Sequence, residues 1–260
     1  MVMNNKNIKM FFFDNDSTLY DHDYDGIRPK TIEAIKLLKK NGYKLCMNTS
    51  RSYQEMRNVP KEVLDLMDCL ILLDGAYIVK DGKVEVEYIN KEHIIKAIKY
   101  LDEHNLTYRF CTDDGGGYIN HDDKYRQLFY KLYDMMPPVK QYDGEEVIHL
   151  LSYADPKQTK ELMDIFSEEE NAPLSIVLET SPAGCNKGLA MLKVAKKYGF
   201  TPEELCAVGD SNNDYDMIKL AGLGIAMGNY RGRLAEVADY ITDDIADEGF
   251  YNAMKHFEFI

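Results

Sequence analysis

The sequence lacks an excess of basic residues, paired cysteines, internal repeats and long hydrophobic runs. It has 31 Lys and Arg against 44 Asp and Glu, so its formal net charge of −13 argues against nucleic acid or an anionic membrane as a partner. Its five cysteines form no Cys-x-x-Cys pair and several lie in apolar segments, as is typical of reduced core residues in a cytoplasmic protein. We expect neither a signal peptide nor a membrane span.

What the sequence does contain is enough apolar material for a sizeable core. The 260 residues are 45% hydrophobic, which suits one large α/β domain or a main domain with a smaller insertion. Near the beginning, short apolar runs at residues 8–13, 43–49 and 69–73 alternate with helix-like segments such as residues 30–40. This alternation predicts a parallel sheet with helices between its strands.

The pattern changes in the middle of the chain and then returns. From about Tyr77 onward, hairpin signals such as Asp81-Gly82 and mixed strands and helices indicate a separate α+β unit. Regular alternation resumes at Asn186. We therefore predict an α/β fold with a Rossmann-like parallel-sheet core, residues 1–80 and 183–260, and an inserted α+β cap domain, residues 81–182.

Two carboxylates follow the first predicted strand, at Asp14 and Asp16. Residues two apart in an extended chain point to the same side, so both acids are expected to face one crevice at the carboxyl end of the strand. Two anions this close repel each other unless a cation lies between them or one takes up a proton. The pair therefore points to a hard metal ion and a proton-transfer role, although a strand followed by a helix-capping acidic turn is the alternative.

Three further groups of polar residues are expected at the same edge of the sheet. Thr49 and Ser50 close the second strand, and their hydroxyls and amides can hold a phosphate oxygen or merely cap a helix. Lys187 begins a helix, where its charge opposes the helix dipole unless another group favours it. Residues 209–214, Gly-Asp-Ser-Asn-Asn-Asp, follow an apolar strand and offer oxygen ligands that suit Mg²⁺, the alternative being a polar loop.

Taken together, these motifs resemble those of a known family. Asp14-Asn15-Asp16-Ser17-Thr18, Thr49-Ser50-Arg51, Lys187-Gly188 and Gly209 to Asp214 resemble, in this order, the four motifs of the haloacid dehalogenase-like (HAD) superfamily. The insertion between the second and third motifs looks like that of the Cof-type, sugar-phosphatase-like branch with a large α/β cap. The chain departs from the usual pattern at Ser17 and Ser50, where glycine is common, and at Asp74, where asparagine is more common.

The resemblance implies roles for the acids. Asp14 would be the nucleophile that forms an aspartyl-phosphate, and Asp16 the general acid and base. The implied cofactor is Mg²⁺, held by Asp14, Asp16 through its main-chain carbonyl, Asp210 and Asp214.

The resemblance also implies how a phosphorylated substrate is held. The phosphate-binding residues would be Thr49, Ser50, Lys187 and Asn213. Arg51 would face the leaving group, or else form a surface salt bridge. The glycine-rich loop containing Gly115 and Gly116 is the candidate specificity element of the cap. The six histidines show no metal-ligand spacing and are expected to be structural or solvated.

The predicted function is that of a Mg²⁺-dependent phosphatase of small phosphorylated metabolites, with sugar phosphates foremost. A phosphosugar mutase shares this architecture and would release an isomerised product instead of free phosphate. A phosphate-ligand sensor with reduced turnover is a third hypothesis, although a pure binder has no need of Asp16. A receiver-type signalling domain would need neither Asp16 nor the long insertion.

Overall fold

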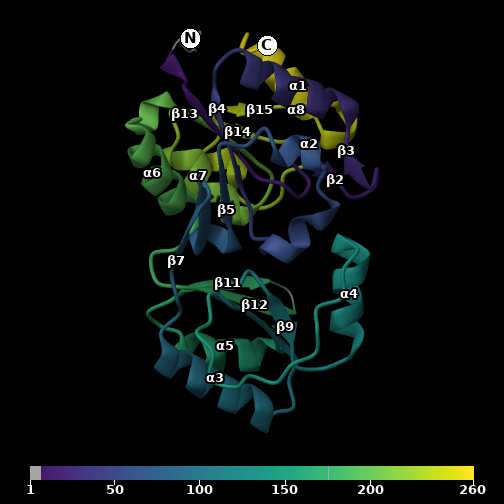
Figure 1. The fold of residues 1–260 in the computed structure, drawn as a ribbon, viewed down its shortest axis with the longest axis vertical. Coiled ribbons are helices and arrows are strands. Elements are labelled where there is room, and N and C mark those ends of the chain that lie inside the picture. The colour runs from purple at the N-terminus through teal and green to yellow at the C-terminus, as the bar shows by residue number, and fades with distance from the viewer. Residues whose placement is uncertain (1–6, 175) are drawn as a thin grey trace.

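The computed structural model describes residues 7–174 and 176–260. Figure 1 shows two layered parts, one above the other: a large sheet between helices, and a smaller sheet with helices α3 and α5 on its outer side. We call the part around the large sheet the core and the part around the smaller sheet the cap. The predicted fold class, a Rossmann-like α/β core with an inserted α+β unit, is confirmed.

Within the described residues the large sheet has eight strands, in the order β15-β14-β13-β1-β4-β5-β6-β7. The strands from β15 to β5 are parallel to one another, whereas β6 and β7 are antiparallel additions at one edge. Their bounds are Met10–Phe13 (β1), Lys44–Asn48 (β4), Cys69–Leu72 (β5), Tyr77–Lys80 (β6), Lys83–Val86 (β7), Leu205–Gly209 (β13), Leu223–Ala226 (β14) and Tyr240–Ile241 (β15).

Strand β1 lies in the middle of this sheet and is buried on both faces. Phe11 and Phe13 pack into the cluster that includes residues of α1 (Pro29–Lys40) and α8 (Gly249–His256). The alternate residues Met10 and Phe12 pack on the other face, against α6 (Lys187–Tyr198) and α7 (Tyr215–Leu220). A strand covered on both faces has to be apolar throughout, so polar side chains that could take part in a reaction are found only after the end of β1.

The cap contains a five-stranded antiparallel sheet, in the order β11-β12-β10-β8-β9. Its strands are Tyr108–Cys111 (β8), Gly117–Ile119 (β9), His149–Tyr153 (β10), Glu170–Leu174 (β11) and Val177–Ser181 (β12). Helices α3 (Lys91–Glu103) and α5 (Pro156–Ile165) place Ile94, Leu101 and Leu162 in one cluster with the sheet. Helix α4 (Lys124–Tyr133) stands at the side of the cap (Figure 1). The other face of the cap sheet, which these helices do not cover, faces the core (Figure 1).

The hairpin predicted at Asp81-Gly82 is present, and it joins β6 to β7. Because β7 pairs with β6, it belongs to the large sheet, and the predicted division at residue 80 falls inside this hairpin. The remaining α-helix and β-strands of the described residues are short: β2 (Tyr20–Asp21), β3 (Gly26–Ile27) and α2 (Lys61–Leu64).

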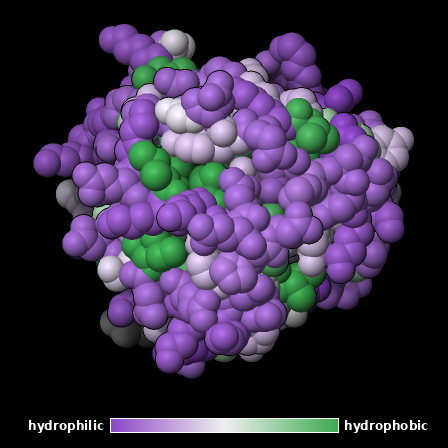
Figure 2. Space-filling model, turned by 90° about the horizontal axis from the view of Figure 1, so that it is seen from below, coloured by the Kyte–Doolittle hydropathy of each residue, from purple (hydrophilic) through white to green (hydrophobic). Residues whose placement is uncertain are grey.

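The surface seen from the cap end is mainly hydrophilic. Figure 2 shows hydrophobic residues on this face only in small, separate groups. None of the helices among the described residues is long and apolar enough to cross a membrane.

Candidate active site

Asp14 is the first residue after β1. Its amide donates a hydrogen bond to the Val208 carbonyl of β13 at 2.9 Å, which fixes it at the carboxyl edge of the parallel strands. Its side chain is almost inaccessible, since the residue is 4% exposed. Burial raises the pKa of Asp14 well above its ordinary value; Lys187 acts in the opposite direction, and the neighbouring Asp214 and Asp210 raise it further. Such a carboxylate needs a cation beside it to stay ionised.

Lys187 provides a positive charge at this position. It is the first residue of α6, and the Asn186 side chain caps this helix by accepting a hydrogen bond from the Leu189 amide at 2.9 Å. Lys187 is 1% exposed, and its ammonium donates to Asp14 Oδ1 at 2.6 Å and to Asp214 Oδ1 at 2.7 Å. Although burial alone would lower it, these carboxylates raise the pKa of Lys187 well above its ordinary value. The two carboxylates explain why a lysine begins this helix.

The loop after β13 delivers two more carboxylates. Asp214 Oδ2 accepts hydrogen bonds from the amides of Asp210 and Ser211, both at 3.0 Å, and these bonds stabilise the conformation of the loop. Gly209 is required by this arrangement, because a Cβ there would lie 2.5 Å from Asp214 Cγ. Burial, with Asp214 as the next contribution, raises the pKa of Asp210 to about 6.

Asp14, Asp210 and Asp214 converge on one point. Each offers an oxygen within 4.8 Å of the others. Lys187 contacts two of the three carboxylates, and the Thr18 hydroxyl donates a long hydrogen bond of 3.4 Å to the third, Asp210. Three buried carboxylates against one ammonium leave excess negative charge, and an all-oxygen donor set suits a divalent cation such as Mg²⁺ or Ca²⁺. The residues present therefore fit the expected metal.

The carboxylate of Asp16 lies outside this trio. It accepts a bidentate pair of hydrogen bonds from Arg51, at 2.8 Å from Nε and 2.6 Å from Nη2, and lies 2.7 Å from His22 Nε2. Burial alone would raise the pKa of Asp16, but these hydrogen bonds hold it well below its usual range. In this arrangement Asp16 is ionised.

Arg51 is buried, at 1% exposed, whereas the Asp16 side chain is 28% exposed, so the surface salt bridge that the sequence left open is in fact a partly buried ion pair. Its guanidinium carbon lies 4.9 Å from the ring centroid of Tyr20 and 4.7 Å from that of Tyr133 on α4. A second buried arginine, Arg109 on β8, pairs with Glu55 of the 3-10 helix η2 (Tyr53–Asn58) at 3.0 Å. Both arginines join the core to the cap.

The structure separates the predicted phosphate-binding residues into different surroundings. Thr49 is buried, and its hydroxyl accepts a hydrogen bond from the Arg51 amide at 3.2 Å. Ser50 lines a cavity of 220 Å³ in which Arg109 is also found. Asn213 lies beside the acidic trio, and its amide donates to Asp74 Oδ1 at 3.3 Å.

The glycine-rich loop of the cap lies against η2 of the core. The Gly117 amide donates to Gln54 Oε1 at 3.3 Å, and a Cβ on Gly115 would lie 3.3 Å from Tyr53 Cβ. The predicted substrate residues Gly115 and Gly116 therefore sit at a contact between cap and core, and the larger cavity described next is lined by other residues.

A cavity of 410 Å³ lies beside Lys187 and opens between core and cap. Its lining includes Lys187, Asn213 and Arg233 of the core and Glu179 of the cap. Ammonium, amide, guanidinium and carboxylate groups all line it, so its walls suit a polar, phosphorylated molecule.

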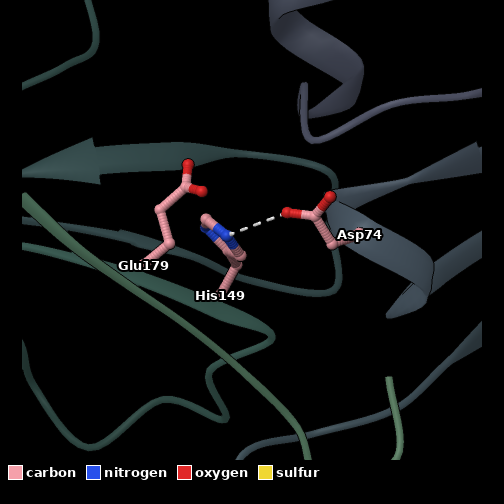
Figure 3. Close-up of side chains that lie close together, drawn as sticks. All are labelled: Asp74, His149 and Glu179. Atoms are coloured by element: carbon pink, nitrogen blue, oxygen red, sulfur yellow. Dashed lines mark ion pairs between the residues drawn. The ribbon is translucent and has the colours of Figure 1, made fainter. Parts of the chain in front are cut away.

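Sequence reasoning missed a second cluster at this border, formed by Asp74, His149 and Glu179 (Figure 3). Asp74 follows β5 with a φ of 51°, in the left-handed region, and its Oδ2 lies 4.0 Å from His149 Nε2. The histidine had been expected to be structural or solvated. The available signal was Asp74 itself, an acid at a position where asparagine is more common.

Residues 11–254 match the family model of haloacid dehalogenase-like hydrolases. The chain belongs to this family. Over 256 residues, 96% of this chain and 95% of the relative, it is 30% identical to the 5-amino-6-(5-phospho-D-ribitylamino)uracil phosphatase YcsE of Bacillus subtilis.

Solved structures agree with this assignment. The HAD subclass IIB sugar phosphatase BT4131 superimposes with a TM-score of 0.89 at 25% identity, covering 97% of this chain and all of the other. The phosphatase BT1666 from Bacteroides thetaiotaomicron gives a TM-score of 0.83 at 26% identity, covering 97% of this chain and 96% of the other. The predictions of a HAD hydrolase of Cof type and of a phosphatase are confirmed.

Proposed function

We propose that this HAD hydrolase is a Mg²⁺-dependent phosphatase that cleaves small phosphorylated metabolites, sugar phosphates foremost, through an aspartyl-phosphate on Asp14. The observation that carries the proposal is the 2.6 Å contact between Asp14 and the buried ammonium of Lys187, beside two further carboxylates. The names of two similar proteins support the substrate class, since one acts on a phosphorylated ribityl compound and the other is a sugar phosphatase.

Asp14 is the proposed nucleophile. An oxygen of its carboxylate attacks phosphorus, the bond to the leaving alkoxide breaks, and the resulting acyl phosphate is then hydrolysed by water. Lys187 keeps Asp14 ionised and attracts the anionic substrate to a site in an otherwise acidic protein. Thr49, Ser50 and Asn213 are proposed to hold non-bridging phosphate oxygens together with Lys187.

Asp16 is the proposed general acid and base. It would protonate the leaving alkoxide and then take a proton from the attacking water. Its bidentate bond with Arg51 stabilises the ionised form, which cannot donate a proton. We therefore propose that Arg51 releases Asp16 when substrate is bound and then faces the leaving group.

Asp14, Asp210 and Asp214, with the main-chain carbonyl of Asp16 suggested by the family resemblance, are the proposed holders of Mg²⁺. When bound, the cation would neutralise the charge that develops on the phosphoryl oxygens. The trio supplies only oxygen donors, in keeping with this ion.

We also propose that the core and the cap are separate domains, with the first boundary moved from residue 80 to just beyond β7. The substrate would occupy the 410 Å³ cavity between them. The closed cap would exclude water from the first step. The loop of Gly115 and Gly116 would move with the cap and contact η2 when the cap is closed.

The test is release of inorganic phosphate from a panel of sugar phosphates and other phosphorylated metabolites, with Mg²⁺ and with a chelator. We expect turnover that is lost on chelation and restored by Mg²⁺, and that is absent in Asp14→Asn. Asp23→Asn, an exposed acid in the following hairpin, is the matched control and should retain activity. Metal-independent turnover, activity in Asp14→Asn, or an isomerised product without free phosphate would each contradict the proposal.

A further inference from the structure

Three side chains from both parts of the molecule face one another at the border between core and cap (Figure 3). Asp74 comes from the core, two residues after the end of β5, whereas His149 and Glu179 lie on the neighbouring cap strands β10 and β12. Leu151 is opposite Glu179 in the antiparallel register, and His149 is two residues from Leu151. His149 and Glu179 are therefore diagonal neighbours on the same face of the cap sheet, the face toward the core.

Among the residues that the structure describes, neither ring nitrogen of His149 has a hydrogen-bond partner, although the residue is 2% exposed. Its Nε2 lies 4.0 Å from Asp74 Oδ2, which is too far for a hydrogen bond. A buried polar group without a partner is unfavourable, so this position favours a ligand. Burial and the nearby Arg109 lower the pKa of His149 to about 3, which leaves an imidazole lone pair free for coordination.

The two carboxylates beside this imidazole are also poorly compensated. Burial raises the pKa of Glu179 to about 8, with Asp74 as the next contribution, and burial raises that of Asp74 as well. In the part of the chain that the structure describes, no hydrogen-bond donor reaches the Glu179 carboxylate. Lys187 lowers both pKa values, but its ammonium is bonded to Asp14 and Asp214.

The ligand atoms of Asp74, His149 and Glu179 all lie within 4.8 Å of one another. We propose that these three residues form a second divalent-metal site, distinct from the acidic trio, which takes a zinc-like first-row transition ion and ties the cap to the core. One imidazole and two carboxylates suit Zn²⁺, Co²⁺ or Fe²⁺, whereas Mg²⁺ prefers oxygen ligands alone.

The site has two consequences for the molecule. Three protein ligands leave one position of a tetrahedral ion open, as in catalytic rather than structural zinc sites. Asp74 and Glu179 both line the 410 Å³ cavity, so a water or substrate oxygen can occupy that position. Because one ligand belongs to the core and two to the cap, the ion stabilises the closed arrangement over any open one.

The experiment uses Co²⁺ as a visible probe of the full-length protein with saturating Mg²⁺ present to occupy the acidic trio. We expect one Co²⁺ per chain with the absorption of a low-coordinate, nitrogen-ligated ion. His149→Ala and Glu179→Gln should each weaken Co²⁺ binding by more than about 100-fold, since even the loss of outer-shell partners costs about 10- to 100-fold. His104→Ala, an exposed histidine of the cap, should bind as the unaltered protein does.

The same titration separates this site from the proposed catalytic metal. Asp14→Asn should retain Co²⁺ binding in the presence of Mg²⁺ even though it loses phosphatase activity. Glu179→Gln is nearly isosteric and keeps the test valid if His149→Ala fails to fold, as judged by circular dichroism. The proposal is overturned if the unaltered protein binds no Co²⁺ under these conditions, if folded Glu179→Gln binds it equally well, or if binding is lost in Asp14→Asn instead.

Discussion

Replacing Lys187 by methionine removes the ammonium that contacts two of the three clustered carboxylates. The side chain is 1% exposed, and both contacts, at 2.6 and 2.7 Å, are of charge-assisted hydrogen-bond length. Methionine has a similar length, so the chief change is loss of the charge. Asp14, Asp210 and Asp214 are then left as buried carboxylates whose repulsion is no longer compensated.

Removing one partner of a buried ion pair costs about 3–5 kcal/mol, because the other charge remains without a counter-ion. At about 2–4 °C per kcal/mol for a chain of this size, Lys187→Met should lower the unfolding temperature by roughly 6–20 °C without metal. The loss should shrink as the pH falls toward 5. Acids whose pKa is raised in the folded protein bind more protons in the folded than in the unfolded state, so acidification favours the folded form. Burial already raises the pKa of Asp210 to about 6, so this acid takes up a proton within the pH range of the experiment.

The assay is thermal and urea unfolding of both proteins with EDTA and with Mg²⁺, over a range of pH. Mg²⁺ should stabilise Lys187→Met more than the unaltered protein, since the variant offers a more negative site. The matched control is Lys193→Met on the same helix, whose ammonium pairs with Glu87 at the surface, and it should change stability by less than about 1 kcal/mol.

A loss below about 1 kcal/mol for Lys187→Met in EDTA, independent of pH, would refute the reasoning. It would mean that the carboxylates do not depend on this ammonium for their charge balance.

Three further predictions concern other parts of the site. Ser17 has a φ of 59°, so Ser17→Gly should be more stable than Ser17→Ala by about 1 kcal/mol in urea unfolding, and equal stabilities would contradict a strained backbone there. For metal-free protein, Glu179→Gln should be more stable than the unaltered chain above pH 8 and equally stable below about pH 4.5. Because the pKa of Glu179 is raised to about 8 in the folded state, the cost of burying its charge is absent where both states are protonated, grows as the pH rises, and is complete where both are ionised. A pH-independent difference would argue against this. Arg51→Met should raise the pKa of Asp16 in the substrate-free enzyme and move the alkaline limb of the kcat/KM profile to higher pH, and an unmoved limb would separate Asp16 from the general-acid role.

Much of the core could be predicted from the sequence because its signals are local. The apolar runs that became β1, β4, β5 and β13 are buried on both faces, and the polar residues after them mark where the strands end. Strand β11 was missed because Glu170, Asn171 and Pro173 carry no apolar alternation; Pro173 is tolerated because β11 lies at the sheet edge. Helix α8 was missed as well, since its eight residues are too few for a clear period.

The site residues, too, could be predicted where their signals are local and were missed where they depend on contacts between distant parts of the chain. Asp14 and Lys187 are 173 residues apart, and the family motifs were needed to predict that they meet. The meeting of Asp74 with His149 and Glu179 depends on how the cap sits on the core, which no local pattern encodes. The pairing of Asp16 with Arg51 also escaped prediction, since the sequence does not reveal that this arginine is buried.

The proposed mechanism requires that Asp14 becomes phosphorylated during turnover. Its most direct test is acid quenching of the enzyme during turnover of a substrate found in the phosphate-release screen, followed by mass spectrometry of the peptide that contains Asp14. We expect a single phosphoryl group on Asp14 that appears and decays with turnover and is absent in Asp14→Asn. Steady phosphate release with no phosphoryl group on this peptide, or with one on another residue, would contradict it.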